Sequence, residues 1–168
     1  MAHHYWSVFA ELIRAPFSHP ALIWGIVPLY FGWVLNELTS SKASYKTAIQ
    51  TGFSFLWAGA HWTYQALAAH SYSAQRRLGL EGLLAVNAIV TILVLLLGVV
   101  VLVCGLRRRF PRYGSFLGHT RFSNYFMIAM FPIQSQYLLW SWDRVIAIVL
   151  FAVPMWIVAH FGLMPFRK

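Results

Sequence analysis

Apolar residues fill five long stretches of this chain, and charged residues are confined to the segments between them. The stretches without Asp, Glu, Lys or Arg are residues 15–36, 47–75, 82–106, 122–142 and 145–166. A helix needs about 20 apolar residues to cross a bilayer core about 30 Å thick. Because the stretches lack the alternating polarity of barrel strands, we expect helices. The predicted spans are residues 20–38, 48–68, 83–106, 122–140 and 144–164.

The segment before the first span is amphipathic and too short to cross a membrane. Its apolar positions recur at helical spacing on one face: Tyr5, Val8, Phe9, Leu12 and Ile13. We therefore expect a helix over residues 5–15 that lies in the membrane interface and is ended by Pro16. The predicted fold class is an all-α, polytopic transmembrane helix bundle that forms one integral membrane domain over residues 1–168.

The predicted spans differ in what they contact. The third is almost purely aliphatic, which is typical of a helix that faces lipid. The fourth carries amides and a serine around Pro132, and it should face protein or water, because unpaired amides are costly in hydrocarbon. Glycines stand seven residues apart in the first two spans (Gly25 and Gly32, Gly52 and Gly59). Such spacing permits close helix packing, either within the chain or against a partner subunit.

Aromatic residues are expected at the two membrane interfaces, where amphipathic rings prefer to lie. The threading of the five spans places Trp24, Trp62, Tyr64, Trp140 and Trp142 at one interface. The same threading predicts one kink in each of the first, fourth and fifth spans, at Pro28, Pro132 and Pro154.

Composition supports the membrane interpretation. Hydrophobic residues make up 60% of the chain and charged residues 10%, whereas soluble domains carry about 25% charged residues. This excludes soluble enzymes and nucleic-acid-binding modules, and the net charge of +9 reflects basic residues in the loops. Four basic residues fall on one side of the predicted membrane and nine on the other. The positive-inside rule then predicts a cytoplasmic C-terminus, in a bacterial or archaeal plasma (inner) membrane.

The sequence contains few groups that suit chemistry inside the membrane. The four acidic residues lie at span ends, and no catalytic motif occurs, so we expect a protein that is not an enzyme. His61 and His160 are candidate axial ligands of haem or (bacterio)chlorophyll, although the threading separates them too far to hold one haem together. In the alternative interpretation, each histidine hydrogen-bonds to the backbone or lies at the head groups.

Arg107, Arg108, Arg109 and Arg112 form the densest group of charges and directly follow the third span. Such a group favours binding to anionic lipid head groups. A phosphate-bearing ligand or an acidic partner protein is the alternative.

Three functional hypotheses follow. The first is a scaffold or accessory subunit of a larger membrane complex, with membrane lipids and other membrane protein subunits as partners and no nucleic acid. The second is a pigment- or haem-bearing subunit of an electron-transfer or light-harvesting complex. The third is a small transporter or channel lined by Asn87, Gln134, Gln136 and the proline kinks.

The layout of the spans resembles the Yip-type family of five-span membrane proteins, some of which are Rab-interacting trafficking factors. The resemblance rests on the segment from Leu12 to Phe17, on Gly114-Ser115-Phe116, and on Arg121, Tyr125 and Pro132. It implies a five-span fold. Family members place the N-terminus in the cytosol, opposite to the orientation that the charges predict, and no functional residue is carried over.

Overall fold

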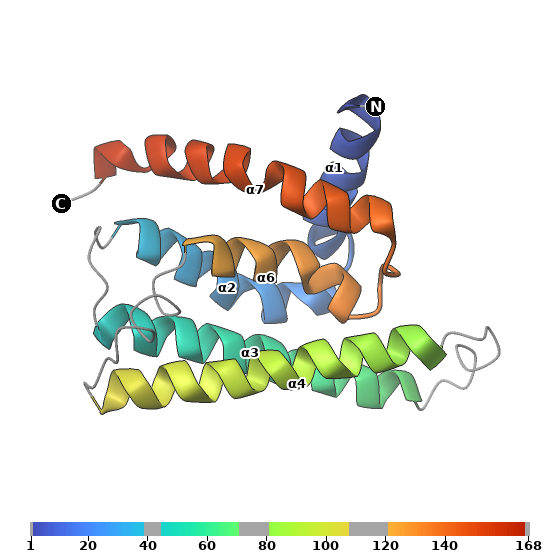
Figure 1. Ribbon diagram of the computed structural model, residues 1–168, viewed down its shortest axis with the longest axis horizontal. Helices are drawn as coiled ribbons and strands as arrows, with labels where there is room; N and C mark the ends of the chain where they lie inside the picture. Colours follow the sequence, from blue (N-terminus) through green and yellow to red (C-terminus); the bar gives the residue numbers. More distant parts are fainter. Residues whose placement is uncertain (1, 39–44, 71–80, 108–120, 167–168) are drawn as a thin grey trace.

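The computed structural model describes residues 2–38, 45–70, 81–107 and 121–166. These residues form six α-helices and one short 3₁₀ helix, without strands: α1 (Ala2–Ser18), α2 (Pro20–Leu38), α3 (Tyr45–His70), α4 (Glu81–Leu106), α6 (Arg121–Gln134), α7 (Trp142–Gly162) and η2 (Met164–Phe166). Figure 1 shows α2, α3, α4, α6 and α7 running back and forth between the same two ends of a bundle. The prediction of an all-helical fold is confirmed for the described residues.

Three helices are long and apolar enough to cross a membrane: Pro20–Leu38, Leu83–Leu106 and Trp142–Gly162. They coincide with the first, third and fifth predicted spans, and they support an integral membrane protein. α3 and α6, which cover the second and fourth predicted spans, do not meet the same criteria of length and hydropathy. Five membrane crossings therefore stay a prediction.

α6 is the central helix of the bundle, and it contacts α1, α2, α3 and α7. One side of it, with Met127 and Phe131, joins the hydrophobic core shared with α2 and α3. The other side, with Tyr125 and Ile133, joins the core shared with α1 and α7. At 14 residues the helix is about 21 Å long, shorter than a bilayer core. Because protein surrounds α6, its polar residues need not meet lipid.

The helix predicted over residues 122–140 ends at Gln134 in the structure. Gln136 has a φ of 63°, in the left-handed region. Its N–H donates to the carbonyl of Ile133 at 2.9 Å, and the N–H of Tyr137 donates to the carbonyl of Pro132 at 3.1 Å. These two bonds form a Schellman motif, which stops a helix. The sequence lacks the usual sign of this motif, because glutamine stands at the position where glycine is typical.

The N-terminal helix extends beyond its predicted range of 5–15 and continues through Pro16 to Ser18. The ring of Pro16 is fully buried, and the hydroxyl of Ser18 donates to the carbonyl of Arg14 at 3.4 Å. The free energy gained by burying the ring of Pro16 therefore exceeds the cost of the helical hydrogen bond that proline cannot donate. Phe9 and Leu12 are buried in the core with α6 and α7. Figure 1 shows α1 crossing the direction of the other helices at one end of the bundle, and its position in the membrane interface stays a prediction.

α3 and α4 form the most extensive helix pair, and glycines on both helices lie at their contact. A Cβ atom on Gly52 would lie 2.7 Å from the backbone nitrogen of Leu102, and one on Gly105 would lie 3.0 Å from the backbone nitrogen of Ile49. The close packing expected at Gly52 and Gly59 thus occurs within the chain. Gly25 and Gly32 of α2 likewise face inward, toward α3 and α6.

Candidate functional site

A cavity of about 350 Å³ lies between the second half of α3, the first half of α4 and the end of α6. Its volume is within the range of small-molecule sites, which runs from about 300 to 1,000 Å³. The lining is mostly apolar, with a few polar side chains: Trp62, Thr63, Ala66, Leu84, Asn87, Ala88, Thr91, Ile92, Leu95, Gln134 and Gln136. None of these described lining residues is an acid, a base or a histidine, so the cavity suits a neutral molecule.

The three amides that the sequence analysis assigned to a transporter lining, Asn87, Gln134 and Gln136, all line this cavity. They come from α4 and from the end of α6, which are far apart in the sequence. Thr91 joins the two elements, since its hydroxyl donates to Oε1 of Gln134 at 3.4 Å. Of the three predicted kink positions, Pro132 lies next to the cavity, where its carbonyl accepts the bonds that end α6.

Three buried polar atoms on the cavity lining have no hydrogen-bond partner among the described residues. They are Nε2 of Gln134, Oε1 of Gln136 and Nε1 of Trp62. The side chains of Gln134 and Trp62 belong to residues that are only 2% and 1% exposed. An unpaired buried polar atom costs about 1–3 kcal/mol. Each of these atoms is itself enclosed by protein, so a molecule in the cavity could reach it only after the side chain had moved.

Two of these atoms belong to residues at or just after the end of α6. Gln134 is the last residue of the helix, and Gln136 takes the left-handed conformation that turns the chain away from the helix axis. A non-glycine residue in this conformation costs about 1–2 kcal/mol. Backbone strain and unpaired polar atoms thus occur together here, which is typical of functional sites.

The segment after α6 lies against the same end of the cavity. The indole N–H of Trp140 donates to Oδ1 of Asn87 at 2.6 Å, which fastens this segment to α4. Between them lies a second cavity of about 20 Å³, and it shares Leu84, Asn87 and Gln136 with the larger one. We call residues 135–141, which connect α6 to α7, the strap.

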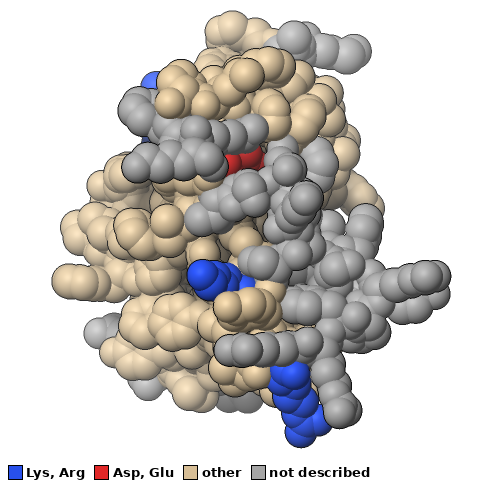
Figure 2. All heavy atoms as spheres, turned by 90° about the vertical axis from the view of Figure 1, so that its left-hand side faces the viewer, with Lys and Arg blue, Asp and Glu red and all other residues tan. Residues whose placement is uncertain are grey.

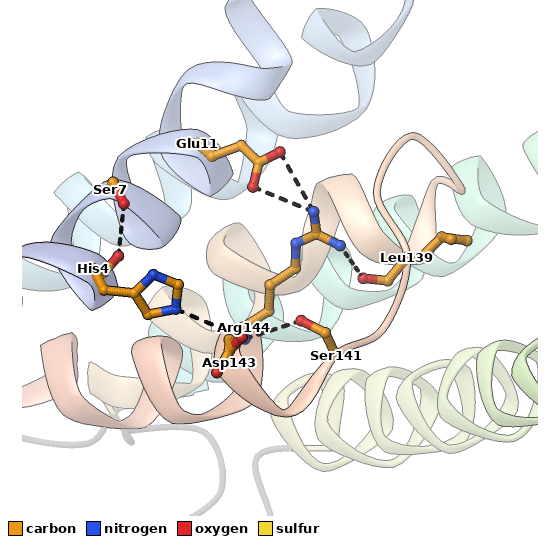
Figure 3. A network of polar contacts seen from close by, with 7 residues as sticks. All are labelled: His4, Ser7, Glu11, Leu139, Ser141, Asp143 and Arg144. Atoms are coloured by element: carbon orange, nitrogen blue, oxygen red, sulfur yellow. Dashed lines mark hydrogen bonds and ion pairs between the residues drawn. The ribbon is translucent and has the colours of Figure 1, made fainter. Parts of the chain in front are cut away.

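The strap is also held by a polar network at the start of α7 (Figure 3). The guanidinium of Arg144 donates to the carbonyl of Leu139 in the strap, and it forms an ion pair with Glu11 of α1 at 3.2 Å. Nε2 of His4 lies 3.6 Å from a carboxylate oxygen of Asp143. Figure 3 shows Arg144 reaching from α7 to both α1 and the strap. α1 is thereby linked to the segment beside the cavity.

Trp62 and Trp140 illustrate what the sequence analysis missed. Both were expected as interfacial rings, yet Trp62 is 1% exposed and lines the cavity, while Trp140 hydrogen-bonds to α4. By contrast, Trp24 and Trp142 are 79% and 82% exposed, as an interfacial ring would be. Composition alone does not separate the two kinds of tryptophan, because both lie at span ends.

His61 does not line the cavity. Its ring stacks on Phe131 with 5.4 Å between ring centroids, and a Cβ atom on Gly25 would lie 2.7 Å from it. Nε2 is enclosed by the protein and has no hydrogen-bond partner in the described part of the chain. The ring would have to turn away from Phe131 and Gly25 to ligate a haem or chlorophyll, and its role as a cofactor ligand stays a prediction.

His160 lies in the last turn of α7, at the end of the bundle away from the cavity. Its Nδ1 is 3.9 Å from Oε2 of Glu37, and its ring contacts Trp156 and Phe161. Glu37 stands at the end of α2, as predicted for the acidic residues, yet its side chain is fully buried. His61 and His160 thus have different neighbours, Phe131 and Gly25 for the first and Glu37, Trp156 and Phe161 for the second.

The predicted lipid-binding arginines fall largely outside the described residues. Arg107, which follows α4, is exposed, whereas Arg108, Arg109 and Arg112 lie in the part that the structure does not describe. Figure 2 faces the end of the bundle where α4 ends and α6 begins, and the basic side chains drawn there are scattered. Among the described residues, no group of three or more His, Cys, Asp or Glu side chains could hold a metal ion.

Comparison of the chain with protein-family models, with curated proteins and with solved structures finds no significant match. The resemblance to the Yip-type family therefore stays a prediction.

Proposed function

We propose that this chain is a non-enzymatic membrane protein that binds a small molecule in the amide-lined cavity, as a small transporter does. The observation that carries the proposal is the convergence of Asn87, Gln134 and Gln136 on the lining of one largely apolar cavity. A largely apolar cavity with a few converging polar groups is the usual form of a small-molecule site.

The position of the cavity supports transport or delivery within the membrane. α4, which supplies much of the lining, exposes aliphatic residues such as Leu93 and Leu96 along its outer side. A molecule that partitions into the bilayer can therefore reach this helix from the lipid.

The scaffold or accessory-subunit hypothesis draws on the exposed apolar residues of α4 and α7. Contact with acyl chains accounts for the same surfaces, since lipid-facing helices are apolar. We keep this hypothesis as a prediction that the experiment below also tests, because copurifying chains are detected together with bound small molecules.

The test is native mass spectrometry of the protein after mild extraction from membranes. We expect the wild type to carry a small-molecule adduct and Ala88→Phe to lose it, because Ala88 lines the cavity and a phenyl ring would fill it. Ala85→Phe is the matched control, since Ala85 is exposed on the same helix and does not line the cavity.

A wild type without an adduct, or an adduct that survives Ala88→Phe unchanged, would overturn the proposal. A stoichiometric partner chain in place of an adduct would favour the accessory-subunit hypothesis. An absorption spectrum of the same sample tests for pigment or haem, and a visible band lost in His61→Ala or His160→Ala would favour the cofactor hypothesis.

A further inference from the structure

The polar side chains that line the cavity turn little polar surface toward its open space. Three of their polar atoms are enclosed by the protein: Nε1 of Trp62, Nε2 of Gln134 and Oε1 of Gln136. The hydroxyl of Thr63 donates to the carbonyl of Gly59 at 2.8 Å, and the hydroxyl of Thr91 donates to Oε1 of Gln134 at 3.4 Å. These groups are therefore either covered or already used within the protein.

The amide nitrogens of Asn87 and Gln136 are the polar side-chain atoms of the lining that are not accounted for in this way. Both residues also line the small cavity beside the strap, so they lie where the two cavities adjoin. Even with these nitrogens included, the surface that faces the open space is almost entirely carbon.

A cavity with such a surface suits hydrocarbon. An apolar cavity of about 150 Å³ in a protein core stays dry and takes up apolar molecules. The cavity between α3, α4 and the end of α6 is larger, at about 350 Å³. Its described lining has no charged side chain to compensate a charged head group. The part of a ligand that enters it is therefore apolar.

The cavity is open to the outside, and its opening belongs to the apolar surface of α4. Ala88 and Ile92 line the cavity and are also exposed, Ile92 by 56%. Exposed apolar side chains continue from them along the same helix, at Ile89 and Leu93. Since α4 is long and apolar enough to cross a membrane, this surface is the one that acyl chains contact.

The position of the opening along α4 separates acyl chains from water-soluble molecules. The apolar span of α4 begins at Leu83, and Ala88 and Ile92 follow five and nine residues later. At 1.5 Å per residue they lie about 8 and 14 Å along the helix axis from its start. The hydrocarbon core is about 30 Å thick, so the opening lies within the acyl-chain layer.

We propose that the cavity takes up one acyl chain of a bilayer lipid from the side, while the head group of that lipid stays at the membrane surface. The chain packs against Ile92 and Leu95 of α4. Because the lining and the bilayer are equally apolar, the gain comes from van der Waals contacts that fill a void. This inference rests on the proposed function and names the ligand class of that site.

The experiment is photo-cross-linking of the full-length protein in phosphatidylcholine nanodiscs. One probe is a phosphatidylcholine with a diazirine near the middle of an acyl chain, and the matched probe carries the diazirine on its head group. Labelled residues are mapped by tandem mass spectrometry. We expect the acyl probe to label the lining residues Ala66 and Leu95 about fivefold or more above the head-group probe, because the opening lies within the hydrocarbon layer.

Two variants block the cavity from opposite helices. Ala88→Phe and Thr63→Phe should each lower acyl labelling of Leu95 about fivefold or more, because a phenyl ring fills the space. Ala85→Phe is the matched control, since Ala85 is exposed on α4 and does not line the cavity. It should leave this labelling within about twofold. Labelling of Leu93, which is exposed outside the lining, normalises every sample.

Failure of this inference and failure of the proposed function give different results. Acyl-chain binding is overturned if the wild type is labelled at Leu93 but not in the lining, if both probes label Leu95 equally, or if its labelling survives both blocking variants. A polar adduct in the native mass spectrum that Ala88→Phe removes would then leave the small-molecule site standing. Absence of both the adduct and the labelling of the lining would overturn both proposals.

Discussion

Glycine substitutions at the α3–α4 contact test the helix packing directly. A Cβ atom on Gly52 would lie 2.7 Å from the backbone nitrogen and 2.9 Å from the Cα of Leu102, whereas one on Gly59 would lie 2.6 Å from Cδ2 of Leu95. The two overlaps are of similar size, but they meet different atoms. The backbone of α4 cannot move locally, and the tip of the Leu95 side chain can rotate.

Two opposing effects set the magnitude. Alanine favours a helix interior over glycine by up to about 1 kcal/mol, and overpacking costs about 1–3 kcal/mol. We expect Gly52→Ala to lower the free energy of unfolding by about 1–2 kcal/mol, because the two helices must separate. Gly59→Ala should change it by less than about 1 kcal/mol, since rotation of Leu95 relieves the overlap. At Gly162 a Cβ atom meets nothing within 4 Å, so Gly162→Ala should be neutral or mildly stabilising.

The measurement is unfolding of the three variants in mixed detergent micelles, followed by helical circular dichroism. The expected order of stability is Gly162→Ala, then Gly59→Ala, then Gly52→Ala. If Gly52→Ala were as stable as Gly162→Ala, α3 and α4 would not approach as closely as the structure has them. Equal losses at Gly52 and Gly59 would refute the distinction between backbone and side-chain overlap.

Three further predictions concern the strap and its anchors. A double-mutant cycle of Glu11→Gln and Arg144→Gln should give a coupling of about 0.5–1 kcal/mol in unfolding experiments, reduced by salt, because Glu11 is 48% exposed; a coupling of zero would contradict the pairing. Gln136→Gly should raise the free energy of unfolding by about 1 kcal/mol by relieving the left-handed backbone, and a loss of stability would refute the strain. Trp140→Phe removes the bond to Asn87 and should lower the free energy of unfolding by about 1 kcal/mol, whereas an unchanged stability would contradict this attachment of the strap to α4.

The sequence predicts those parts of the fold that depend on a single physical effect, such as the burial of apolar residues in a membrane. α2, α4 and α7 are long apolar runs, and their positions agree with the predicted first, third and fifth spans. The spacing of Gly52 and Gly59 likewise predicted close packing, because the absence of a side chain has few other uses in an apolar helix. Their partner could not be predicted, since the glycines of α4, Gly98 and Gly105, have the same spacing and could serve another helix equally well.

The end of α6, which covers the fourth predicted span, could not be predicted because it depends on tertiary structure. Nothing local forbids a helix through residues 135–140, since Pro132 removes a single N–H and no glycine follows. In the structure, Gln136 accepts a strained conformation, and Trp140 is held by Asn87, which lies 53 residues away. A contact between such distant residues is invisible to an analysis of local periodicity, so the apolar pattern extended the helix too far.

The amide side chains that line the cavity show which properties of a polar residue in an apolar helix can be predicted from sequence and which cannot. An amide in hydrocarbon requires a partner, so Asn87 and Gln134 had to face protein or water wherever their helices packed, and the sequence analysis grouped them on this ground. It could not foresee that Thr91 and Trp140 satisfy one oxygen of each amide and leave Nε2 of Gln134 unpaired. A packing role alone would have been served better by leucine at that position, because an unpaired buried amide costs about 1–3 kcal/mol. The cost falls two residues from the strained backbone of Gln136, so two unfavourable features coincide at the end of α6, as is typical of functional sites.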